Sequence, residues 1–123
     1  MKIIITLILI IFAIVQAEEA PYNPTPDRYV DIHHSIIDVQ VDLEDSTVVG
    51  NVTHTMSSLR TDLYIIQLDC EDTKIKSVKI NNNRPLKYSL NGPKLNIELD
   101  RTYGFDDTLT LSIDYLAKPK KGL

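Results

Sequence analysis

The sequence predicts an all-β domain of antiparallel strands, arranged as a β-sandwich or as saddle-like sheets. Three observations carry this prediction. Apolar residues recur at every second position in several segments, turn residues separate these segments at short intervals, and no convincing helical segment occurs between them. Short antiparallel connections favour two packed sheets over a parallel α/β architecture.

Residues 1–17 have the pattern of a secretory signal peptide. Lys2 supplies a positive charge, the run from Ile3 to Val15 is apolar except for Thr6, and the segment ends on the small residue Ala17. A membrane-spanning helix needs about 20 apolar residues, so the shorter run favours cleavage over a stable membrane span. We therefore expect an exported protein that is secreted, periplasmic or at the cell surface.

Residues 18–28 form the next segment, which we expect to be an extended leader. Pro21, Pro24 and Pro26 disfavour both a helix and a sheet ladder there. The remaining residues, 29–123, suffice for one compact domain, since domains cluster near about 100–150 residues.

Charge and cysteine content restrict the partners and the source of stability. The 123 residues carry a formal net charge of −4, so no basic field is present to attract nucleic acid. Cys70 is the single cysteine, so no intramolecular disulfide can form and stability must come from an ordinary core. Period-two counting places Cys70 on the buried side of its strand with Ile66 and Leu68.

The strand-like segments each predict a core face and a solvent face. The segment around Asp38 alternates most clearly, residues 47–56 pair with it as a hairpin, and Asn91-Gly92 signals a second hairpin. A one-residue slip between Ile75 and Val78 indicates a bulge. The residues predicted to face the core include Ile37, Val39, Val41, Leu43, Val48, Gly50, Val52, Met56, Leu95, Ile97, Leu99, Leu109, Leu111, Ile113 and Tyr115.

No group of residues typical of a catalytic centre is recognisable in the chain. His33 and His34 are adjacent on a strand and point to opposite faces, so they cannot share one metal ion without distortion. The sequence lacks H-E-x-x-H, C-x-x-C and G-x-S-x-G motifs. We therefore assign no catalytic, cofactor-binding or metal-binding residue. Asn51-Val52-Thr53 matches a glycosylation acceptor, although it lies inside a predicted strand.

Several segments follow one another in a recognisable order. They are residues 29–42 (YVDIHHSIIDVQVD), 48–53 (VVGNVT), 67–70 (QLDC), 75–78 (IKSV), 109–115 (LTLSIDY) and 118–123 (KPKKGL). This succession resembles the N-terminal domain of the aminopeptidase N family of zinc metallopeptidases, which includes leukotriene hydrolase. The resemblance extends over nearly the whole chain that remains after the expected signal peptide, residues 18–123.

The resemblance implies a saddle-like β domain that packs on a thermolysin-like catalytic domain and forms part of the wall of the active-site cleft. In that family the zinc motif and the catalytic residues come later in the sequence, and the residue that meets the substrate's amino terminus lies just beyond a motif like residues 121–123. No such residue is therefore carried over to this chain. Zinc is implied for the absent catalytic domain, and none is expected here.

We therefore expect residues 29–123 to be the non-catalytic β domain of an exported aminopeptidase N-like enzyme, truncated at its C-terminal end and inactive alone. Its partner would be the catalytic domain of the same enzyme, and peptides would be met only through the full enzyme. The alternative is a self-standing secreted β-sandwich module that binds a protein or a sugar. The absence of tryptophan weakens the sugar option, because sugar platforms favour large aromatic faces.

Overall fold

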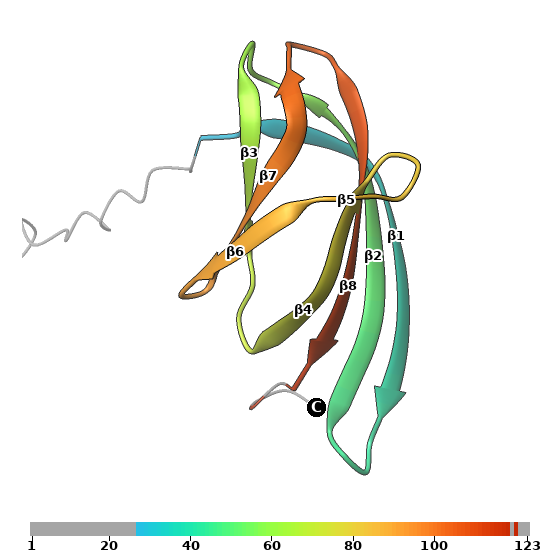
Figure 1. The fold of residues 1–123 in the computed structure, drawn as a ribbon. Coiled ribbons are helices and arrows are strands. Elements are labelled where there is room, and N and C mark those ends of the chain that lie inside the picture. The colour runs from blue at the N-terminus through green and yellow to red at the C-terminus, as the bar shows by residue number, and fades with distance from the viewer. Residues whose placement is uncertain (1–26, 119, 121–123) are drawn as a thin grey trace, which may run out of the picture.

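The fold consists of two antiparallel sheets that pack face to face. The computed structural model describes residues 27–118 and 120, and the predicted signal peptide and most of the predicted leader lie outside these residues. The long sheet has the strand order β1-β2-β8-β4-β5 and the short sheet the order β3-β7-β6 (Figure 1). The strands are β1 (Val30–Asp42), β2 (Thr47–Ser58), β3 (Leu63–Asp69), β4 (Thr73–Ile80), β5 (Arg84–Pro85), β6 (Lys87–Asn91), β7 (Lys94–Tyr103) and β8 (Thr108–Ala117). The predicted all-β class is confirmed for this part of the chain.

Strand β8 is the centre of the long sheet, where it pairs with β2 on one side and β4 on the other. Its alternation is as predicted: Leu109, Leu111 and Ile113 are buried, while the residues between them point to the other face. From Leu111 to Ala117, β8 has a hydrogen-bonded neighbour on both sides, so it holds the sheet together.

The core lies between the two sheets. Leu95, Ile97 and Leu99 from β7 and Ile66 from β3 are buried, as the alternation predicts. Tyr103, the last residue of β7, is also buried. The full set of buried apolar residues is Met56, Leu63, Ile66, Ile75, Val78, Ile80, Leu95, Ile97, Leu99, Tyr103, Leu109, Leu111 and Ile113.

Two local predictions about the strands are confirmed. The β4–β8 register shifts between Ile75 and Ser77, which is the bulge that the slipped alternation indicated. The β6–β7 hairpin turns at Gly92, whose φ of 57° is a left-handed conformation that glycine adopts without a Cβ penalty.

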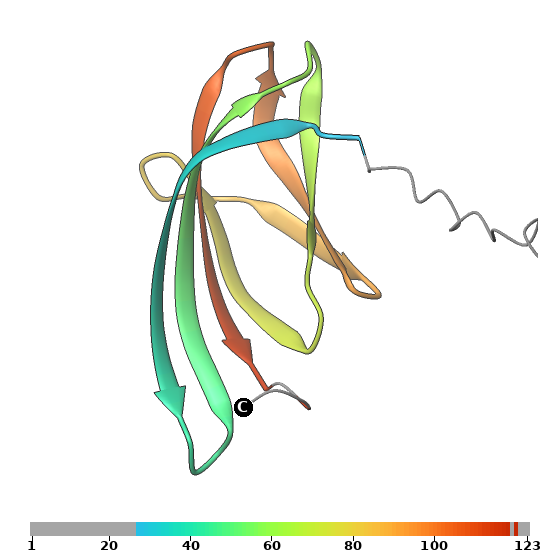
Figure 2. The same ribbon diagram turned by 180° about the vertical axis from the view of Figure 1, so that it is seen from behind.

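The prediction that β1 buries one face is wrong. Ile37, Val39 and Val41 are 64%, 47% and 48% exposed, and Leu43 in the following turn is also exposed. The alternation itself is real, because these residues pair with the inward-facing Val52, Gly50 and Val48 of β2. The far ends of β1 and β2 extend past the strands of the short sheet, which leaves this part of the inner face uncovered (Figures 1 and 2).

Candidate interaction surface

The uncovered part of the long sheet carries the most distinctive surface in the described residues. We call it the β1–β2 apolar surface and define it by Ile37, Val39, Val41, Val48, Val52 and Tyr115. The first three are exposed, whereas Val52 and Tyr115 are half-buried and pack against the core. The surface is therefore an extension of the core that the short sheet does not reach.

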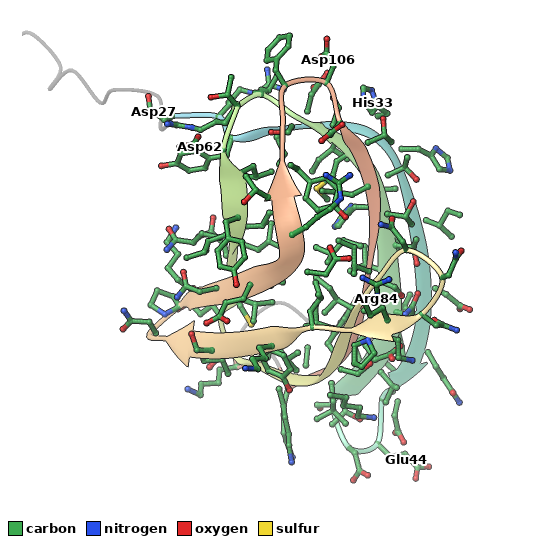
Figure 3. All side chains as sticks on the ribbon, turned by 45° about the horizontal axis from the view of Figure 1, so that its top comes forward. Asp27, His33, Glu44, Asp62, Arg84 and Asp106 are labelled. Carbon is green, nitrogen blue, oxygen red and sulfur yellow. The ribbon has the colours of Figure 1, made fainter. Side chains whose placement is uncertain are left out.

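The strand register explains why these side chains lie together. Ile37 pairs with Val52, which pairs with Ile113 on β8, and Val39 pairs with Gly50, which pairs with Tyr115. Directly paired residues of antiparallel strands point to the same face, so each row runs from the exposed edge strand toward the sheet centre. Figure 3 labels Glu44 in the β1–β2 turn, at the opposite end of the molecule from Asp106.

Gly50 makes room for the tyrosine ring on this surface. A Cβ atom built on Gly50 would lie 2.6 Å from both Cζ and Oη of Tyr115. That separation is well inside van der Waals contact, so the phenol end of the Tyr115 ring can lie against Gly50 only because glycine has no side chain. The close approach gives Tyr115 a fixed place between the core and the exposed residues of β1.

The opposite face of the same strands carries a polar network. The Asn51 Nδ2 donates to Asp114 Oδ1 at 2.7 Å and to Ser112 Oγ at 3.0 Å, and the Ser77 Oγ donates to Asp114 Oδ2 at 2.5 Å. Lys79 lies 3.7 Å from the same carboxylate. The network links β2, β8 and β4 across the face that points away from the short sheet.

These contacts also set the protonation of the carboxylate. The hydrogen bond from Ser77 and then the one from Asn51 hold the pKa of Asp114 below its usual value, and Lys79 adds a smaller effect in the same direction. Asp114 is therefore ionised at neutral pH and acts as an acceptor. The same bonds occupy the Asn51 amide, so the predicted glycosylation acceptor is a structural residue in the middle of a strand.

The three histidines do not meet at one site. His33 occupies a bulge where the β1–β2 register shifts between Ile32 and His34, and its Nε2 lies 3.0 Å from the Ser57 Oγ. His54 on β2 has its Nδ1 2.8 Å from the Ser35 Oγ, and burial lowers its pKa. Within residues 27–118 and 120, no three His, Cys, Asp or Glu side chains are placed to hold a metal ion.

A second polar cluster stabilises the end of β7. The Tyr103 hydroxyl donates to Asp100 Oδ1 at 3.0 Å, Arg84 contacts the other oxygen of Asp100 at 2.6 Å, and burial raises the pKa of Tyr103. Arg101 lies 4.0 Å above the Tyr103 ring and contacts Asp107 at 3.2 Å. Each charged group here has a partner on a neighbouring strand or turn, which indicates a structural role.

Cys70 directly follows β3 and packs against the core with Leu68. The thiol is free and half-buried, and burial raises its pKa. The predicted place on the buried side is confirmed, and a raised pKa disfavours the reactive thiolate. In the described part of the chain there is also no helix with the length and apolar character that a bilayer crossing requires.

Comparison with solved structures gives the class of protein that has this fold. The chain matches an M1 zinc metallopeptidase from Deinococcus radiodurans with a TM-score of 0.67 and 21% identity, over 76% of this chain and 22% of that chain. It matches leukotriene A4 hydrolase from Saccharomyces cerevisiae with a TM-score of 0.64 and 20% identity, over 75% of this chain and 15% of that chain. These likenesses show that the two sheets have the fold of a part of these enzymes.

A sequence relative supports the same class. Leucine aminopeptidase 2 from Kluyveromyces lactis is 32% identical over 59 residues, which are 48% of this chain and 9% of that enzyme. No protein-family model matches the chain. This relative and the solved structures confirm the resemblance that was inferred from the sequence. The chain spans at most about a fifth of the length of each of these solved enzymes.

Proposed function

We propose that residues 29–123 are the leading, non-catalytic β domain of an exported aminopeptidase N-like zinc metallopeptidase. The β1–β2 apolar surface is the observation that carries this proposal, because it is continuous with the core and no described residue covers Ile37, Val39 and Val41. Such a surface is typical of a site where another protein domain docks. The similarity to zinc metallopeptidases supports the catalytic domain as that partner.

The docking would use the exposed side chains of β1 as its apolar centre. Complete burial of a valine or isoleucine side chain contributes about 1.5–3 kcal/mol relative to full exposure. Ile37, Val39 and Val41 are about half exposed, so covering them supplies a substantial part of this free energy. The resulting role is structural: the domain covers the catalytic domain and shapes the cleft that admits peptide amino termini.

The zinc of such an enzyme belongs to the catalytic domain. Residues 27–118 and 120 do not fit a zinc site, since they offer no convergent set of three ligands and zinc prefers four. We therefore expect the chain alone to be inactive toward peptides. Peptides would meet this domain only as part of the cleft of the whole enzyme.

Export would follow from residues 1–17, whose charge and apolar length are those of a secretory signal. The expected product of cleavage begins at Glu18. Mass measurement of the chain recovered from the exported fraction of its own cells tests this directly, and a product that retains Met1–Ala17 would contradict it.

The test of the docking role starts from the genomic sequence downstream of Leu123. We expect an in-frame continuation with an H-E-x-x-H motif, followed by a glutamate about twenty residues later as a further zinc ligand. The chain is then prepared alone and joined to that continuation. The joined protein is expected to bind less hydrophobic dye and to melt at a higher temperature.

A pair of variants separates docking from a general loss of exposed apolar area. Val41→Ser removes an apolar side chain from the β1–β2 apolar surface, and Leu90→Ser removes an equally exposed one from β6 on the short sheet. Val41→Ser should weaken the contact with the catalytic domain, while Leu90→Ser should leave it intact. If both variants weakened the contact with the catalytic domain equally, or if the downstream sequence lacked the zinc motif, a self-standing binding module would be favoured.

A further inference from the structure

Strand β1 is an open edge of the long sheet. It pairs with β2 on one side, and no described strand pairs with its other side. The edge therefore presents a row of backbone N–H and C=O groups that can pair with another strand. This backbone edge is distinct from the apolar surface described above, which is a face of the sheet.

The other sheet edges are shorter, and two of them carry the usual protecting residues. β5 spans only Arg84–Pro85 and contains a proline, while β6 contains Lys87. β1 is 13 residues long, and its sequence VDIHHSIIDVQVD has no proline, lysine, arginine or glycine. Natural edges resist pairing through short length, charged side chains (lysine above all), proline or a bulge. β1 has the bulge at His33 and three aspartates, but it has neither lysine nor proline.

We propose that two copies of this chain pair through their β1 edges, antiparallel, about a two-fold axis at Val39. In this register Val39 faces Val39 of the second copy and Ile37 faces Val41. The paired stretch runs from Ile36 to Asp42, on the regular part of the strand beyond the bulge at His33. Direct pairs share a face, so the exposed Ile37, Val39 and Val41 of both copies form one apolar stripe.

The charges of β1 favour this register over the register centred on Asp38. Pairing centred on Asp38 would place two aspartates directly opposite each other, which is destabilising. Pairing centred on Val39 places Asp38 opposite Gln40 and Asp42 opposite Ile36, so no two like charges face each other. Because the contact uses the same patch on both copies, it closes at two and leaves no free β1 edge for a third.

Cysteine cross-linking tests the axis. Val39→Cys and Ile37→Cys are each made in a Cys70→Ser background, so that each protein has one thiol, and each is oxidised with glutathione disulfide. Directly opposite residues of an antiparallel pair have Cα atoms about 4.5–5.5 Å apart, which lies within the range that a disulfide bridges. We expect several-fold more covalent dimer with Val39→Cys. Ile37→Cys is the matched control, because Ile37 lies on the same strand and the same face and is also exposed, but it lies opposite Val41.

Analytical sedimentation of the Cys70→Ser chain, which has no cysteine, measures its oligomeric state independently. We expect a reversible monomer–dimer equilibrium that Val39→Lys shifts to monomer without changing the melting curve, since two lysines would meet at the axis. Equal cross-linking of the two cysteine variants, a strictly monomeric chain or assemblies larger than a dimer would overturn the proposal. These measurements use the chain alone, so their failure is separate from a failure to dock on a catalytic domain.

Discussion

The inner face of the long sheet has two halves with the same sequence pattern and different surroundings. In the half formed by β8 and β4, Leu111, Ile113 and Val78 lie under the short sheet and are buried. In the half formed by β1 and the end of β2, Ile37, Val39 and Val41 have equivalent apolar side chains and are exposed. Alternation therefore identifies which face is apolar, and it does not identify what covers that face.

The largest expected difference between the halves concerns a buried charge. Leu111 is 0% exposed, so Leu111→Asp places an unpaired carboxylate in the core and should lower the free energy of unfolding by about 4 kcal/mol or more. Val39→Asp, at a position that is 47% exposed, should cost about 0.5 kcal/mol. Chemical denaturation measures both values. Similar losses would mean that the β1 half is covered in solution.

A smaller effect is expected where the two halves meet. Gly50→Val introduces a side chain into the space occupied by the Tyr115 ring, and overpacking of this kind costs about 1–3 kcal/mol. The same substitution in a Tyr115→Ala background should cost less, because the ring is gone. A double-mutant cycle of unfolding free energies gives the coupling. A coupling free energy of zero would show that the position of the Tyr115 ring does not depend on the missing side chain at Gly50.

The smallest expected effect concerns the polar network behind the uncovered half. Asp114→Asn weakens the acceptor of the Ser77 and Asn51 hydrogen bonds and should cost about 1 kcal/mol near neutral pH. Because the folded protein lowers the pKa of Asp114, its stabilising effect is present above the unfolded value and is lost as pH falls through the folded value. The difference between the two proteins should therefore shrink below about pH 4.

The control for this pH dependence is Ser77→Ala combined with Asn51→Ala. These changes remove the two hydrogen bonds that contribute most to the lowered pKa of Asp114. In that background, Asp114→Asn should have a smaller effect at neutral pH and a weaker pH dependence. An unchanged pH dependence would assign the stabilisation to other carboxylates.

Much of the fold could be predicted from local patterns. The bulge before Val78, the turn at Gly92 and the buried positions of β7 and β8 each leave a signal within a few residues of sequence. The exposure of β1 was not predicted, because the alternation of its apolar residues is as regular as that of the buried strand β8. The polar network was missed for a different reason: Asn51, Ser77 and Asp114 are far apart in sequence and meet only through strand order.

The sequence by itself determined the strands, their faces and the absence of a recognisable catalytic motif, because period-two alternation and turn residues act over short distances. The tertiary structure decided which apolar faces are buried. The short sheet covers β8 and β4 but does not reach the far end of β1 and β2, so identical side chains become core in one place and surface in the other. Burial depends on the distant strands that pack across a face, and an alternating pattern contains no information about their position.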